Sequence, residues 1–199
     1  LGKRHDLSGQ VVEQGIAVAQ AHKHLVLEKP IALEIDGARR LVRAVNEAGI
    51  KNVVCFVLHW YPQFVNQLAL VRSGAIGQVF LADCEYLHGH LERYASQWRW
   101  TWNKSMAGST LLQGGIHAVD AMRQFLSAPA VEVTAYSHGH SSTYEYPPTI
   151  VAIVRFADGA IAKITSSFET AMPYQLNLRL YGTRGTIQNE RLWSETISP

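Results

Sequence analysis

The sequence predicts two architectures in one chain: half of a doubly wound α/β unit with a parallel sheet, then an α+β domain whose open sheet is mostly antiparallel. Three observations predict this. Helical and strand patterns alternate up to about residue 72, and strand patterns follow one another after residue 130. Between these two regions, a helical pattern at residues 113–126 separates two strand patterns, as a crossover helix does.

In the first part, apolar spacing and punctuation define each element. Ser8 is a candidate N-cap for the first helix, Gly49 ends the second helix, and Pro62 is acceptable in the first turn of the third. The intervening strands are nearly continuous apolar runs, which are typical of strands covered on both faces. The predicted elements are helix 9–21, strand 24–28, helix 36–48, strand 52–58 and helix 62–72.

The second part consists mainly of strands. Residues 79–87 alternate as a half-buried strand does, and Asp158 and Gly159 form a hairpin signal between two later strands. The predicted strands are 79–87, 131–137, 149–156, 161–168, 176–181 and 186–188. We therefore place the domain boundary near residue 60, with a nucleotide-type α/β layer in residues 1–60 and a sheet domain in residues 61–199.

Composition excludes several classes of partner. The formal net charge of +2 is mild and the basic residues are scattered, so the basic stripe of a nucleic-acid-binding protein is missing. No apolar run approaches the roughly 18 residues of a membrane span. Cys55 and Cys84 lie in apolar runs, which predicts buried thiols and a reducing, cytoplasmic setting. The chain begins without methionine, which is consistent with a piece of a longer protein.

Glu28, Lys29 and Pro30 follow directly after the first predicted strand. In open α/β sheets, ligands bind beyond the carboxyl ends of the strands. An ammonium there can donate to a substrate hydroxyl or a cofactor ribose, the carboxylate can hold it, and the proline can fix the turn, in a cis bond if required. The alternative is a surface ion pair followed by a turn proline, which these three residues alone favour.

A second group of candidate residues lies at the start of the predicted crossover helix. Gln113, His117 and Asp120 have the spacing of adjacent helical turns, and a neutral imidazole can exchange a proton near pH 7. A single helical histidine is more often a hydrogen-bonded structural residue. Gly114 and Gly115 favour a site, because two glycines in a helix cost about 1 kcal/mol each unless something must approach closely.

Histidine pairs flank the same predicted edge. If strands 79–87 and 131–137 run in the same direction, their carboxyl ends bring together His88, His90, His138 and His140 beside His117. Paired histidines resemble zinc ligands, but no cysteine or evident carboxylate completes the set and the central glycines indicate turns. A polar pocket without a metal is the better interpretation.

Tryptophans recur at every second position in the segment that contains Trp98, Trp100 and Trp102, with Arg99 and Lys104 among them. Such a segment can hold a sugar face or a nicotinamide ring. It can equally cover a core or form an oligomer contact, and the sequence does not choose between these interpretations.

Taken together, KHLVLEKPIAL (residues 23–33) and GSTLLQGGIHAVDAMRQFL (residues 108–126) resemble the two signature regions of the glucose-fructose oxidoreductase / inositol dehydrogenase / MocA family of NAD(P)-dependent oxidoreductases. Three further stretches resemble family segments in the same order: SGAIGQVFLADCEY, the stretch around Trp98 and Arg99, and YGTRGTI. The resemblance implies the second half of a Rossmann domain followed by the family's substrate domain.

The resemblance also implies roles for individual residues. Lys29 matches the family lysine that contacts substrate and cofactor, with Glu28 and Pro30 as its neighbours on the cofactor side. His117 matches the histidine that orients or protonates the substrate oxygen, and Asp120 matches a supporting aspartate. The remaining substrate-side matches are Gln113, Trp98, Arg99 and His59. Gln113 stands where many members have aspartate, and its amide cannot act as a base.

The implied activity is hydride transfer between NAD or NADP and a sugar, inositol or related polyol, in a homodimer or homotetramer joined through the open sheet. No Gly-x-Gly-x-x-Gly follows a strand here; in the family that turn precedes the region where this chain begins. Two alternatives therefore stay open. One is a noncatalytic protein, either a binding or dimerisation module or an inactive fragment. The other is a redox-assisted glycosidase of the same family.

Overall fold

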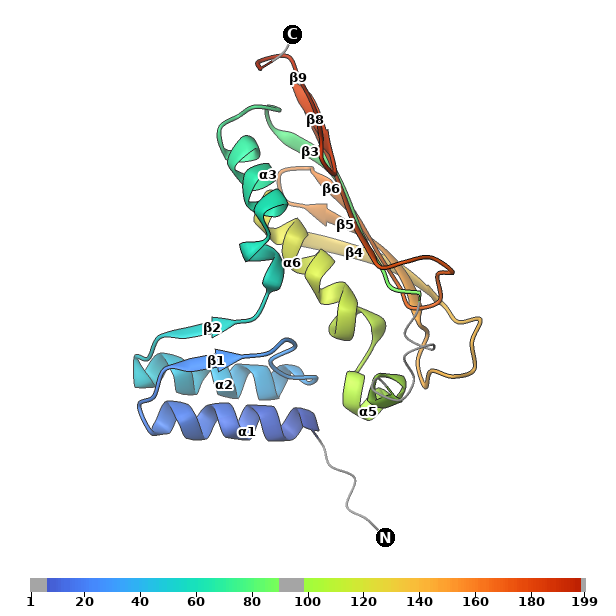
Figure 1. Cartoon of the computed structure of the whole chain (residues 1–199). Coiled ribbons are helices and arrows are strands. Elements are labelled where there is room, and N and C mark those ends of the chain that lie inside the picture. Colours follow the sequence, from blue (N-terminus) through green and yellow to red (C-terminus); the bar gives the residue numbers. More distant parts are fainter. Residues whose placement is uncertain (1–6, 90–98, 198–199) are drawn as a thin grey trace.

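The computed structural model describes residues 7–89 and 99–197. Its first part is a two-stranded parallel sheet, β1 (Leu25–Leu27) and β2 (Asn52–Val54), packed on helices α1 (Leu7–Gln20) and α2 (Ile35–Ala48). Both helices lie on the same side of the two strands (Figure 1). Gly15 lets them approach, because a Cβ there would be 2.7 Å from Leu41 Cδ1. The helix–strand alternation predicted for this part is confirmed.

The second strand of this layer is shorter than predicted. β2 ends at Val54, and residues predicted as its continuation form the 3₁₀ turn η1 (Val57–Trp60). β1 offers only three paired positions, and the last hydrogen bond across the pair runs from the Cys55 amide to the Leu27 carbonyl. Beyond that point the apolar run has no strand partner, so it leaves the strand conformation and forms the 3₁₀ turn. Leu58 of this turn is buried in the core of the following domain.

A seven-stranded sheet forms the second part of the molecule, in the order β4-β5-β6-β3-β7-β8-β9. β3 pairs in parallel with β6, and every other neighbouring pair is antiparallel. The strands are β3 (Val79–Leu87), β4 (Ala130–His138), β5 (Thr149–Phe156), β6 (Ile161–Ser167), β7 (Gln175–Gly182), β8 (Gly185–Gln188) and β9 (Arg191–Ser194). The mostly antiparallel sheet is thus as predicted, and β9 is an additional short strand.

The predicted crossover is confirmed in direction. β4 runs parallel to β3, since two antiparallel pairings and one parallel pairing connect them, but β5 and β6 lie between them in the sheet. The carboxyl ends of β3 and β4 therefore share one edge. Helix α6 (Ile116–Phe125) returns the chain across the sheet. It is preceded by short elements that were not predicted: η2 (Arg99–Trp102), α5 (Lys104–Ala107) and the π-helical segment η3 (Leu111–Gly115).

Helices α3 (Pro62–Arg72) and α6 cover one face of this sheet and leave the other open (Figure 1). The core lies beneath the helices, where Cys84, Leu180 and Met122 are almost fully buried. Cys55 is half-buried, and both cysteines are free. Within residues 7–89 and 99–197, no helix is long and apolar enough to cross a membrane.

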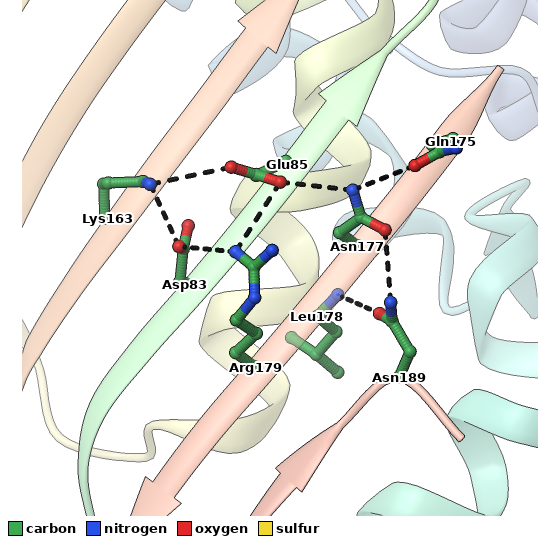
Figure 2. Close-up of polar contacts among 8 residues, drawn as sticks. All are labelled: Asp83, Glu85, Lys163, Gln175, Asn177, Leu178, Arg179 and Asn189. Atoms are coloured by element: carbon green, nitrogen blue, oxygen red, sulfur yellow. Dashed lines mark hydrogen bonds and ion pairs between the residues drawn. The ribbon is translucent and has the colours of Figure 1, made fainter. Parts of the chain in front are cut away.

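The open face carries a half-buried ionic network across β6, β3 and β7 (Figure 2). Asp83 accepts contacts from Lys163 Nζ at 2.9 Å and from Arg179 Nη1 at 3.0 Å. Glu85 lies 3.6 Å from each of the same two cations and accepts a hydrogen bond from Asn177 at 3.1 Å. Two carboxylates and two cations neutralise one another, so the centre of the face has no net charge.

Candidate active site

The end of β1 and the start of the crossover helix meet through Lys29. Its ammonium donates a 2.7 Å hydrogen bond to the backbone carbonyl oxygen of Gln113, in the π-helical segment η3. The Lys29–Pro30 peptide bond is cis, as the sequence suggested. The structure therefore joins the two regions that carry the family resemblance, although they are 84 positions apart.

The sequence predicted that the Glu28 carboxylate holds the Lys29 ammonium, but the described residues show no direct ion pair between these two groups. Among the described residues, Glu28 is exposed and its carboxylate accepts a 3.3 Å hydrogen bond from the Lys29 backbone amide. The Lys29 side chain points instead to η3, because the Gln113 carbonyl offers a partner in a less hydrated place. Burial lowers the pKa of Lys29 below its ordinary value, and the charge of Glu28 acts in the opposite direction.

Gly114 and Gly115 allow strands β3 and β6 to approach the start of α6. A Cβ on Gly114 would lie 2.5 Å from Tyr86 Cε1, and one on Gly115 would lie 2.7 Å from Ser166 Cβ. The close approach that the glycines predicted is thus made by protein side chains. The predicted continuous helix is also interrupted here by a π-helical turn, a feature that occurs frequently at functional sites.

His117 lies in the first turn of α6 and is 7% exposed. Its ring is stacked against Tyr86, with centroids 6.0 Å apart, and meets the edge of Phe56 at 6.1 Å. Burial lowers the pKa of His117 to about 4, and the nearby positive charge of Lys29 acts in the same direction. The imidazole is therefore neutral at pH 7. Its Nδ1 is buried and has no hydrogen-bond partner within the described part of the chain.

Asp120 and His59 form a close pair beside His117. His59 Nε2 lies 2.6 Å from Asp120 Oδ2, and the Asp120 side chain is only 13% exposed. Asp120 thus contacts another predicted site residue, and its supporting role stays a prediction. The pair links η1, just after the nucleotide-type layer, to α6 of the sheet domain, and fixes His59 relative to His117.

Sequence reasoning did not select the aromatic residues Phe56, Tyr86 and Tyr174 near His117. Besides Phe56 and Tyr86, Tyr174 packs on Tyr86 with ring centroids 5.3 Å apart, and His88 lies at the same distance from Tyr174. Tyr86 follows Ala82 and Cys84 on the helix-covered side of β3. That alternation was visible in the sequence, but which helix residue would meet Tyr86 was not.

The tryptophan segment is only partly described, and Trp98 lies outside the described residues. Arg99 is exposed in η2, and no described contact joins it to Lys29 or His117. Trp102 packs against a buried cluster that includes Tyr144, Tyr146 and Phe168, which favours the core interpretation for this tryptophan. Residues 99–102 form a 3₁₀ turn.

The histidine pairs do not converge on a metal site in residues 7–89 and 99–197, where no group of three potential ligands is found. The His88 ring is stacked on Tyr86. His138 is exposed, and the His140 backbone amide donates to Glu169 at 2.8 Å. His90 lies outside the described residues.

Comparison with known proteins agrees with this arrangement. Residues 66–188 match the GFO/IDH/MocA C-terminal domain, and residues 8–57 match the NAD-binding Rossmann fold of the oxidoreductase family. The chain is 29% identical to 1,5-anhydro-D-fructose reductase of Ensifer adhaerens, over 88% of this chain and 52% of that protein. It is 27% identical to inositol 2-dehydrogenase of Rubrobacter xylanophilus, over 83% of this chain and 46% of that protein.

A solved structure has the same fold. The WlbA dehydrogenase from Bordetella pertussis, in complex with NADH and UDP-GlcNAcA, superposes with a TM-score of 0.82 at 24% identity. The match covers 94% of this chain and 60% of that one. The chain spans about half the length of the curated relatives that it matches.

Proposed function

Because this chain belongs to the GFO/IDH/MocA family of oxidoreductases, we propose that it forms the substrate half of a nicotinamide-dependent dehydrogenase acting on a sugar, inositol or related polyol. The observation that carries this proposal is the convergence of Lys29 and His117 from opposite halves of the chain. Residues 1–60 then serve the nucleotide side, and residues 61–199 serve the substrate and subunit contacts.

The residues at the edge of β1 and β2 suit a nicotinamide cofactor, either NAD or NADP. Lys29 presents a cation and Phe56 an aromatic ring there, and the unpartnered His117 Nδ1 faces a buried environment. Glu28, Lys29 and Pro30 would hold the ribose that is attached to the nicotinamide ring of the cofactor. The bound cofactor would supply the hydride acceptor or donor.

The chain's own residues handle the proton. Neutral His117 accepts a hydrogen bond from the reacting hydroxyl, and the Lys29 ammonium donates to the same oxygen as negative charge develops on it. Burial lowers the pKa of Lys29 toward neutral pH, which makes its ammonium a better proton donor than it would be in water. The lowered pKa of His117 keeps its imidazole uncharged, so that a ring nitrogen can accept the hydrogen bond of the hydroxyl. Gln113, His59, Arg99 and Trp98 are proposed to bind the other substrate hydroxyls, with Asp120 positioning His59.

The test is oxidation of a panel of sugars and inositols by the natural protein, followed through the absorbance of reduced nicotinamide. Lys29→Ala and His117→Ala should each lower kcat/KM by at least about a hundredfold, the usual scale for loss of an acid–base group. Lys51→Ala and His24→Ala are matched controls, because both side chains are exposed at the opposite ends of β1 and β2. Wild-type turnover by both site variants would contradict the assignment.

We infer further that two or four copies associate through the open sheet face. Large apolar side chains are exposed on it, including Tyr136 (80%), Ile153 (44%) and Trp193 (52%). The register places each of them on the face opposite the helices. Tyr136 and Ile153 lie in the same rows as Glu85 and Asp83 of the neutral network in Figure 2. A face of this composition can be covered by a second copy without leaving an unbalanced charge buried.

A further inference from the structure

A cavity of about 420 Å³ lies between helix α3 and the sheet, on the helix-covered side. Leu58 and Phe64 line it from the η1 and α3 side, and Leu176 and Leu178 line it from β7. Cys84 of β3 is also part of the wall. The cavity is therefore mainly apolar, and its size is that of a small-molecule site.

The rim of the cavity exposes apolar surface that folding alone does not explain. Val57 is 59% exposed, Tyr61 is 60% exposed and Tyr174 is 49% exposed, and all three line the same hollow. Single exposed apolar residues are common, but three large ones around one concave site indicate a surface that a ligand covers.

A chain of aromatic contacts connects the rim of the cavity to the proposed reaction centre. Tyr174, on the rim, packs on Tyr86 at 5.3 Å, and Tyr86 is stacked on His117 at 6.0 Å. Two further lining residues, Leu58 and Ala121, are sequence neighbours of His59 and Asp120. A substituent of a substrate held at His117 would therefore reach the rim by extending over Tyr86 and Tyr174.

Apart from the hydroxyls of Tyr61 and Tyr174 on its rim, the lining offers few free hydrogen-bonding groups. The Gln67 side chain is buried and donates a 2.7 Å hydrogen bond to the Asn189 backbone carbonyl. Burial raises the pKa of the Cys84 thiol, so it remains uncharged. Gln63 is the other lining side chain with an amide. A second hydroxylated ring buried in this cavity would lose water hydrogen bonds and regain only those that the two rim tyrosines and the Gln63 amide offer, whereas an aryl or alkyl group would lose none.

We propose that this cavity receives an apolar substituent of the substrate, so that the enzyme prefers a sugar or polyol bearing an aryl or larger alkyl group over one with a small substituent or none. This inference rests on the proposed function and deepens it. Tyr61, Tyr174 and Leu176 then determine specificity, and Lys29 and His117 keep their roles at the reacting hydroxyl.

The experiment compares phenyl and methyl glycosides of glucose, galactose, mannose and N-acetylglucosamine, in binding and in turnover, with the natural protein and cofactor. Burial of the phenyl ring should favour the phenyl form by about tenfold or more in Kd and in kcat/KM. Tyr61→Ala should remove most of this preference for the phenyl form. Trp60→Ala is the matched control, since Trp60 is the adjacent aromatic residue, is 75% exposed and does not line the cavity.

The outcomes separate the two proposals. Tight phenyl glycoside binding that Tyr61→Ala weakens, without cofactor reduction, would overturn the dehydrogenase and support the cavity. Equal kcat/KM for both forms would support the dehydrogenase and overturn the cavity. If no glycoside of the panel binds, benzyl alcohol decides: saturable binding weakened by Tyr61→Ala and retained in Trp60→Ala supports the cavity, and its absence overturns it.

Discussion

The Lys29 ammonium lies 2.7 Å from the backbone carbonyl oxygen of Gln113, which joins the end of β1 to the π-helical segment before α6. This bond fixes a cation from the nucleotide-type layer beside a histidine from the sheet domain. The two sequence signatures, residues 23–33 and 108–126, each supply one partner of this hydrogen bond.

Lys29→Met is expected to separate function from stability. The half-buried ammonium is costly in the folded state, as its lowered pKa indicates, so its removal offsets the lost hydrogen bond to Gln113. The free energy of unfolding in urea should change by less than about 1 kcal/mol, while turnover is lost. Lys51→Met is the control for an exposed lysine. A decrease in the free energy of unfolding of more than about 3 kcal/mol would instead show that Lys29 is needed for stability.

His117 should make the protein less stable in mild acid. Its pKa is about 4 in the folded state and 6.5 ordinarily, so the unfolded chain binds a proton first as the pH falls. Its contribution to stability is complete above about pH 6.5 and is lost progressively down to about pH 4. Urea midpoints at about pH 7 and about pH 5 should differ less in His117→Gln than in wild type. An equal difference in His117→Gln would contradict the prediction, and His24→Gln, an exposed histidine, should behave as wild type.

Gly114→Ala should disturb the site by steric overlap. The added Cβ would lie 2.5 Å from Tyr86 Cε1 and 2.9 Å from Phe168 Cε1, so two packed rings must move. We expect a loss of about 1–3 kcal/mol in unfolding free energy, measured in urea. Gly37→Ala in α2 is the control, because its nearest contact is a Val12 methyl at 3.3 Å. Equal stability of the two variants would mean that the Tyr86 ring is not packed against this position.

Asp120→Asn should alter positioning at the site. The amide cannot accept the His59 hydrogen bond with the strength of a carboxylate, so His59 is held less firmly. A fall in kcat/KM of about tenfold to a hundredfold is expected, with the unfolding free energy little changed. In a double-mutant cycle, Asp120→Asn should add almost nothing to His59→Asn, because Asp120 acts through His59. Fully additive losses would show that the two residues act separately.

Sedimentation velocity tests the open face. The protein should sediment as a dimer or tetramer, and Ile153→Asp should reduce it to single chains, because a buried unpaired carboxylate opposes association. Val42→Asp is the control, since Val42 is 49% exposed on α2 and lies outside the sheet. A wild-type mass equal to one chain would refute association through this face.

The sequence predicted elements well where the apolar pattern and its punctuation agreed. β3, β5 and α3 have the predicted bounds, and the hairpin at Asp158 and Gly159 joins β5 to β6. The failures have a common cause. Residues 55–58 continue an apolar run without a strand partner, and β9 is too short to carry a pattern of its own. Both depend on which strand lies alongside, which is not a local property.

The sequence by itself determined the two layers, the candidate residues Lys29, His117 and Asp120, and the need for close packing at Gly114, because apolar period and residue chemistry are local. Only the tertiary structure decided that Lys29 bonds Gln113, that Asp120 holds His59 and that Tyr86 is stacked on His117. Each of these contacts joins distant positions. Strand order and the π-helical turn decide which side chains meet. Neither of them alters the local apolar pattern of the sequence, so the contacts could not be predicted from it.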